Sequence, residues 1–184
     1  MNALTALISV LLLALIAMVG VGVVAIIVIS QFILGLWMVD LDYYDAWYRR
    51  APELHKSIGV TLFLIMVFRL IWRWVNKKPQ PIPGKPWLEE RIVRIVHSML
   101  YFLIFFVMLS GYLISTADGR PIEVFGMVNI PATLTGIEKQ EDIAGNVHLI
   151  LAIALVSLSS FHAMAALKHH FINRDKTLIR MFGR

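Results

Sequence analysis

The sequence contains no cysteine, and this absence excludes several kinds of chemistry at once. Disulfides, thiolate nucleophiles and cysteine-ligated clusters all need that residue. Charge is also scarce, because only 16% of the 184 residues are Asp, Glu, Lys or Arg, against roughly 25% in a typical soluble domain. The hydrophobic residues, 59% of the chain, gather in long runs. Together these features predict one membrane domain over residues 1–184 rather than a soluble enzyme.

Four apolar segments predict an all-α, integral membrane four-helix bundle. About 20 residues of helix cross the hydrocarbon core of a bilayer. The first apolar run is nearly twice that length and lacks the basic start of a signal peptide, so we expect it to be retained as a span. The predicted spans are about 12–38, 55–75, 95–115 and 144–169.

The charged residues between the spans predict the orientation of the chain. The connection between the second and third spans and the C-terminal segment are rich in Lys and Arg, whereas the other two connections are mainly acidic. By the positive-inside rule the N- and C-termini are cytoplasmic. The same rule accounts for the net charge of +5, so no nucleic-acid partner is expected. The middle connection is predicted to be extended, because it contains Pro79, Pro81, Pro83 and Pro86.

Histidines inside predicted spans are the strongest indication of function, because an ionisable residue in a bilayer is costly unless it is compensated. His148 and His162 lie fourteen residues apart on the last span. That spacing places them on nearly the same helix face, about 21 Å apart along the axis. His55 begins the second span at the level of His148. We therefore predict a haem b bound between His55 and His148 near the periplasmic face, with His162 a further metal ligand near the cytoplasmic face.

Two other residues are candidates for binding the cofactor. Arg69 follows His55 by fourteen residues, and it could pair with a haem propionate or extend to lipid headgroups. His97 could be an interfacial residue, contact a propionate or help to bind quinone. His169 and His170 follow Lys168 and are interpreted as interfacial.

Glycines in the spans have two interpretations. A glycine lets a porphyrin or a neighbouring helix approach closely, and it also serves ordinary helix packing. The glycines concerned are Gly35, Gly59 and Gly111.

Four segments resemble one known family in their order and spacing. They are Leu34-Gly-Leu-Trp-Met38, Ala51-Pro-Glu-Leu-His-Lys-Ser-Ile-Gly59, Ser110-Gly-Tyr-Leu-Ile-Ser-Thr-Ala-Asp-Gly-Arg-Pro121 and Phe161-His-Ala-Met-Ala-Ala-Leu-Lys-His-His170. The chain from about residue 32 onward resembles the bacterial cytochrome b561 family, four-span di-haem proteins related to the b subunits of nickel hydrogenases. The resemblance implies a multi-pass protein of the bacterial inner (plasma) membrane. It also implies electron exchange with ubiquinone. It also implies that His55 and His148 bind the periplasmic haem and that His162 binds the cytoplasmic haem.

The first span departs from the family pattern. The family places a His-Trp pair where this chain has Val21 and Gly22, and no histidine precedes His55. Met18 and His97 are the candidates to replace the missing partner of His162. Otherwise the second haem is five-coordinate or missing, so one or two haems b per chain are expected.

Three functions follow from these patterns. The leading prediction is haem b-dependent electron transfer linked to the quinone pool, with oxidation of periplasmic superoxide by ubiquinone as a possible enzyme activity. Candidate cations for a superoxide funnel lie among carboxylates; they are Arg49, Arg50, Lys56, Arg120 and Lys139. The alternatives are a membrane anchor and electron conduit for another redox enzyme, and a haem-depleted variant. A periplasmic electron donor is a further expected partner.

Overall fold

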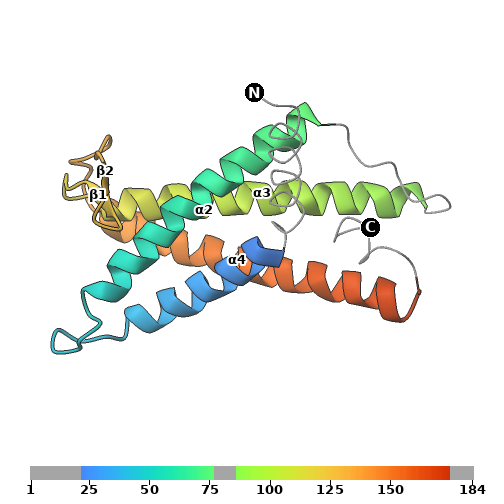
Figure 1. The fold of residues 1–184 in the computed structure, drawn as a ribbon, viewed down its shortest axis with the longest axis horizontal. Helices are drawn as coiled ribbons and strands as arrows, with labels where there is room; N and C mark the ends of the chain where they lie inside the picture. Colours follow the sequence, from blue (N-terminus) through green and yellow to red (C-terminus); the bar gives the residue numbers. More distant parts are fainter. Residues whose placement is uncertain (1–21, 77–85, 175–184) are drawn as a thin grey trace, which may run out of the picture.

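The computed structural model describes residues 22–76 and 86–174 of the chain. A first helix is described over Gly22–Met38. The remaining elements are α2 (Arg50–Val75), α3 (Trp87–Ser115), β1 (Ile122–Val124), β2 (Val128–Ile130) and α4 (Gln140–Phe171), in that order (Figure 1). The predicted positions Met18 and Val21, and the connection that contains Pro79, Pro81 and Pro83, lie outside the described residues.

The three labelled helices are long and apolar enough to cross a bilayer. They contain 26, 29 and 32 residues, and each includes an 18-residue window of high hydropathy with few charges. All three are longer than the predicted spans, since each begins four to eight residues earlier. The additional residues include charged side chains such as Glu89 and Glu90 in the first turn of α3. Carboxylates there interact favourably with the positive N-terminal end of the helix dipole. Their charges also favour a helix start outside the hydrocarbon.

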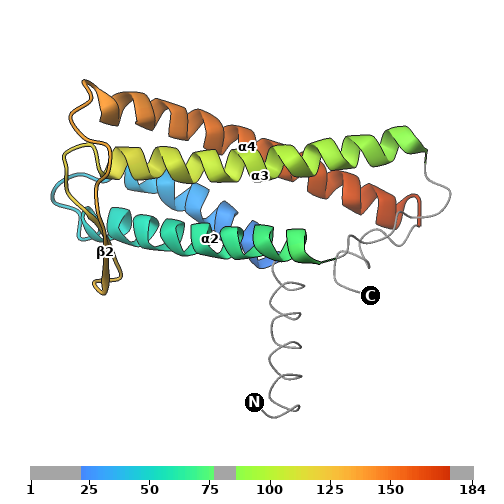
Figure 2. The same ribbon diagram turned by 90° about the horizontal axis from the view of Figure 1, so that it is seen from above.

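The helices form an antiparallel bundle with the β-hairpin at one end. The end of α3 and the start of α4 both lie beside the hairpin, as does the start of α2 (Figure 1). We call this the hairpin end and the opposite end the far end. Helices α3 and α4 pack along each other (Figure 2), and α2 crosses them at an angle (Figure 1).

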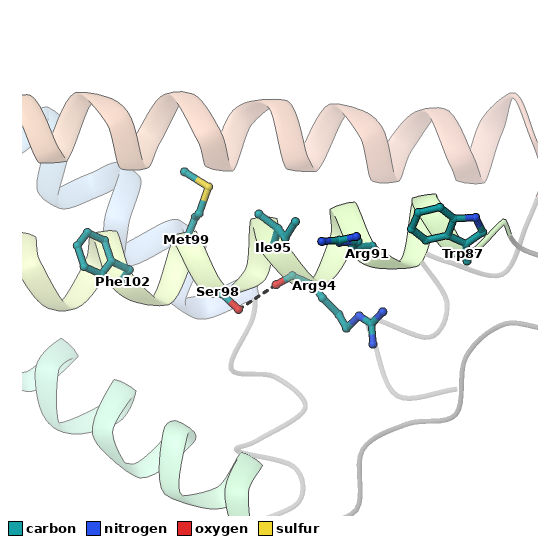
Figure 3. Close-up of a pocket in the computed structure, with 7 residues that line it drawn as sticks. All are labelled: Trp87, Arg91, Arg94, Ile95, Ser98, Met99 and Phe102. Carbon is teal, nitrogen blue, oxygen red and sulfur yellow. Dashed lines mark hydrogen bonds between the residues drawn. The ribbon is translucent and has the colours of Figure 1, made fainter.

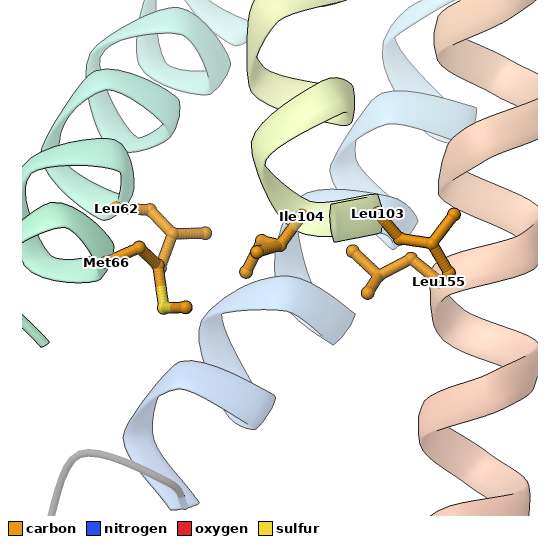
Figure 4. Packing of buried hydrophobic residues seen from close by; sticks show 5 residues of the cluster. All are labelled: Leu62, Met66, Leu103, Ile104 and Leu155. Carbon is orange, nitrogen blue, oxygen red and sulfur yellow. The ribbon is translucent and has the colours of Figure 1, made fainter. Parts of the chain in front are cut away.

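A small apolar core joins all four helices at mid-height. Its buried residues are Leu62 and Met66 of α2, Leu103 and Ile104 of α3, and Leu155 of α4 (Figure 4). Val24, Ile27 and Val28 of the first helix pack against this cluster. The first helix is therefore part of the bundle as far as it is described.

Most other apolar side chains point outward. Ile26, Leu64 and Ile150 are 66%, 63% and 66% exposed, and only 11% of each hydropathic window is buried. A soluble monomer rarely shows continuous apolar surface on this scale. The exposed faces are those of a protein whose surroundings are lipid, so the predicted integral membrane bundle is confirmed.

The hairpin between α3 and α4 is an element that the sequence analysis treated as a loop. Ile122 pairs with Ile130 and Val124 with Val128 across the two strands. Phe125 and Gly126 turn the chain with positive φ angles of 51° and 70°. The alternation of apolar and polar residues covers only three positions in each strand, which is too short to stand out in a sequence.

The hairpin is attached to the start of α2. The backbone N–H of Phe125 donates to Ser57 Oγ at 3.0 Å, and Ser57 is only 3% exposed. Ser57 lies two residues after His55. The hairpin therefore covers the end of the bundle that contains the predicted haem ligands.

Candidate haem site

His55 of α2 and His148 of α4 face each other near the hairpin end. Their ring centroids are 6.2 Å apart, and the ring planes are inclined at 71°. Both side chains are half-buried. The pairing predicted from the levels of these two residues is therefore present in the structure.

The separation of the two rings matches what a shared metal ion requires. An imidazole nitrogen binds a first-row metal at about 2.0–2.1 Å and lies about 1.1 Å from its own ring centroid, so two rings on one ion have centroids about 6.4 Å apart. The observed 6.2 Å is within a few tenths of an ångström of that value. Only small side-chain adjustments are needed for both rings to bind one iron.

Hydrogen bonds set the orientation of His148. Its Nδ1 lies 2.9 Å from the carbonyl oxygen of Val107 and 3.2 Å from Ser110 Oγ. Because a carbonyl oxygen can only accept, Nδ1 carries the hydrogen in that contact and Nε2 keeps its lone pair. Metal-binding histidines commonly donate their other ring nitrogen to a backbone carbonyl in this way.

His55 offers a ring nitrogen without a hydrogen-bond partner. Its Nδ1 is buried and makes no hydrogen bond within the described part of the chain. The residue is held in place by its backbone instead, since Gln31 Nε2 of the first helix donates to the His55 carbonyl at 2.7 Å. A buried polar atom without a partner is unfavourable unless a ligand compensates it.

Two glycines lie beside these imidazoles, and Gly111 makes the closer approach. A Cβ atom at Gly111 would lie 3.1 Å from His148 Cε1 and 3.3 Å from Nδ1. A Cβ atom at Gly35 would lie 3.4 Å from His55 Cε1. At Gly59 the nearest atom is Gln31 Nε2 at 3.8 Å, an ordinary packing distance. Of the three glycines singled out in the sequence, two thus contact the predicted ligands. The site fits a haem iron with two axial imidazoles.

The ring of the other predicted ligand, His162, contacts the ring of His97. Their ring centroids are 4.9 Å apart, with the planes inclined at 72°. His97 lies on α3 and His162 on α4, towards the far end. The first helix cannot supply an imidazole, since the sequence contains no histidine before His55.

Arg69 is held by a tyrosine near the same level. Its Nε donates to Tyr101 Oη at 3.1 Å, and the guanidinium carbon of Arg73 lies 5.4 Å from the Tyr101 ring centroid. His97 precedes Tyr101 by about one helical turn on α3. We define the polar cluster as Arg69, Arg73, His97, Tyr101 and His162, of which Arg73 is exposed.

The remaining histidines lie near the far end, away from the His55–His148 pair. His169 Nε2 is 3.4 Å from a Glu89 carboxylate oxygen, and His169 Nδ1 is 3.1 Å from Asn173 Nδ2. Over residues 22–76 and 86–174, no three His, Asp or Glu side chains gather closely enough to hold a metal ion by themselves. A haem does not need such a group, because the protein supplies only the axial ligands.

A shallow groove of about 820 Å³ lies along one face of α3. Figure 3 shows its lining side chains, which contain no histidine. They are Trp87, Arg91, Arg94, Ile95, Ser98, Met99 and Phe102. The groove therefore does not form part of the paired-histidine sites.

The cations near the hairpin end are set among carboxylates, as the sequence indicated. Arg120 forms an ion pair with Asp118, and hydrogen bonds from Arg120 lower the pKa of the Asp118 carboxyl. Arg49 and Arg50 line a depression of about 310 Å³ that also contains Asp45. The positive charge at this end is thus partly balanced.

Sequence reasoning did not find the residues that orient His148 and Arg69. Ser110 and Tyr101 reach these side chains only because α3 packs against α4 and α2. Ser110 stands beside Gly111 in one of the four segments quoted above, which was the available signal. Tyr101 had no comparable signal.

The chain as a whole is similar to several known proteins. A family model described as prokaryotic cytochrome b561 matches residues 22–184. Cytochrome b561 homolog 2 of Escherichia coli (strain K12) is 52% identical over 160 residues, which are 87% of this chain and 85% of that protein. Cytochrome b561 homolog 1 of the same organism is 29% identical over 137 residues, 74% of this chain and 77% of that protein. A Yersinia pestis protein named probable superoxide oxidase CybB is 25% identical over 138 residues, 75% of this chain and 76% of that protein.

Proposed function

The chain belongs to the prokaryotic cytochrome b561 family of membrane haem b proteins, and from this premise we propose that it carries electrons to the quinone pool through a haem b held by His55 and His148. One observation supports this most strongly. The two imidazoles face each other at 6.2 Å, close to the separation that a shared iron requires.

The protein's own residues contribute binding and orientation. His55 and His148 would hold the haem iron through their ring nitrogens, and Val107 and Ser110 fix the ring of His148. A bound haem supplies one-electron chemistry. Outer-sphere electron transfer needs no general acid or nucleophile, so the chain requires no further catalytic group for that step.

Reoxidation of the reduced protein by a ubiquinone analogue tests this function. The dithionite-reduced, detergent-purified chain should show a b-type spectrum that the quinone returns to the oxidised form. His148→Ala should remove the spectrum, and the matched His169→Ala variant should keep it. A haem-containing protein that quinone fails to reoxidise would contradict the quinone link. A chain without haem would contradict the whole proposal.

Superoxide is the donor that we propose for the hairpin end. The resemblance to a protein named probable superoxide oxidase supports it, as do Arg49 and Arg50 near the start of α2. Superoxide-dependent ubiquinone reduction in proteoliposomes should exceed that of the His148→Ala protein. Equal rates in the two preparations would contradict superoxide as the donor. They would not contradict the proposed haem site.

A bacterial inner-membrane location with both termini in the cytoplasm belongs to the same proposal. It places the hairpin end at the periplasmic face, where superoxide or another donor would arrive. The alternative role, an electron conduit for a separate redox enzyme, predicts a stoichiometric redox partner after purification from native membranes. Isolation of the chain without such a partner would favour the carrier.

A further inference from the structure

The polar cluster at the far end stands where a second haem is expected from the family resemblance. That haem would need an imidazole from the first helix opposite His162. The chain has Val21 and Gly22 at the corresponding positions and no histidine before His55. The only imidazole in ring contact with His162 within the described ranges is that of His97.

The His97–His162 pair is too close to share an iron. Its centroid separation of 4.9 Å is about 1.5 Å shorter than the roughly 6.4 Å that two imidazoles on one metal ion need. The His55–His148 pair in the same bundle has 6.2 Å. The two pairs therefore differ in the property that decides whether iron fits between the rings.

The helices that carry the close pair leave little room to open it. Leu103 and Ile104 of α3 and Leu155 of α4 pack into one buried core one to two helical turns from His97 and His162. In contrast, His55 and His148 lie on α2 and α4, which cross at an angle (Figure 1). In their present side-chain positions the rings of His97 and His162 leave no room for an iron between them.

The positions of the glycines also distinguish the two histidine pairs. Gly35 and Gly111 approach the rings of His55 and His148, whereas no glycine in the described ranges comes within packing distance of His97 or His162. Within the described ranges, glycines therefore lie against the imidazoles of the hairpin-end pair only. The second site does not fit a haem bound by two imidazoles.

We infer that this chain binds a single haem b, at the hairpin end, and that His97 and His162 form a closed, haem-free pair at the far end. The inference rests on the proposed function, because it takes the His55–His148 haem as given. It implies that electrons enter and leave from the same half of the membrane. Without a second haem, the path to the far end, about 21 Å along α4 from His148 to His162, is interrupted.

Haem stoichiometry of the detergent-purified full chain tests the inference. Pyridine haemochrome is measured against protein quantified by amino-acid analysis, and a redox titration is recorded on the same sample. We expect one haem b per chain and a single one-electron transition. The His162→Gln and His97→Gln variants should keep the full haem content, whereas His148→Ala should lose it.

Each other outcome has a definite meaning. Two haems per chain, or the loss of half the haem in His162→Gln, would overturn the inference and leave the proposed function intact. No haem in the wild-type chain would overturn the proposed function itself. If a far-end variant fails to fold, the wild-type stoichiometry and the number of redox transitions still decide.

Discussion

At the scale of single residues, the tightest contact at the candidate site is the one between Gly111 and His148. A methyl group at Gly111 would meet the imidazole at 3.1 Å, a separation that forces one of the two to shift. In a helix interior, Gly→Ala on its own favours the folded state by roughly 0.5–1 kcal/mol. Any loss caused by Gly111→Ala therefore reports on the imidazole rather than on the helix.

We expect Gly111→Ala to weaken haem binding about tenfold, at the lower end of what changes next to a metal ligand cause. Gly145→Ala is the matched control, because a Cβ atom there meets nothing within 4 Å. Haem titration of the two apoproteins measures the difference. Equal haem affinities would show that haem binding does not depend on the present position of the His148 ring.

Tyr101 permits a test of whether the far-end cations serve a haem or the fold. Its hydroxyl accepts the hydrogen bond from Arg69, and bonds to charged groups contribute about 1.5–3 kcal/mol. Tyr101→Phe should lower the thermal midpoint yet leave the absorption spectrum and haem content unchanged. Tyr44→Phe, at a residue that is 93% exposed, is the control. Loss of half the haem in Tyr101→Phe would indicate that this cluster holds a second haem after all.

How far the sequence could predict these residues depends on whether they lie on one helix or on two. The levels of His148 and His162 follow from helical rise and rotation alone, so their spacing predicted them. The sequence named His97 as a candidate partner of His162, but their contact depends on how α3 is placed against α4, which no periodicity within one helix determines. The same reason explains why Tyr101 and Ser110 were not found.

At the scale of elements, the hairpin is held to α2 by the Ser57 hydroxyl. Ser57→Ala removes the acceptor for the Phe125 N–H, a contribution of about 0.5–1.5 kcal/mol. We expect faster amide hydrogen exchange over residues 122–130 and little change elsewhere. Ser98→Ala provides the comparison, since its hydroxyl donates to the Arg94 carbonyl of its own helix. Unchanged exchange in Ser57→Ala would mean that the strand pairing alone positions the hairpin.

The helices themselves were the most predictable elements. Their apolar length and the charged residues that flank them predicted the C-terminal ends of α2, α3 and α4 to within two residues. The starts were predicted too late, because a helix that projects beyond the hydrocarbon continues through polar residues such as Glu89 and Glu90. The hairpin was not predicted because its strands contain only three residues each.

At the scale of the whole molecule, a single haem at one end limits what electron transfer can accomplish. If donor and quinone both react in the same half of the bilayer, turnover moves no charge across the membrane. Proteoliposomes that contain the chain and ubiquinone should therefore reduce quinone without generating a membrane potential. A potential-sensitive dye measures this, and a sustained potential during turnover would require a second redox centre.

The central claim is that His55 and His148 together bind the iron of one haem b. Electron paramagnetic resonance of the oxidised, purified protein tests it most directly. We predict one low-spin signal of the kind given by two axial imidazoles, which changes to high-spin or disappears in both His55→Ala and His148→Ala and persists in His97→Gln. A low-spin signal that survives either of the first two substitutions would contradict the claim.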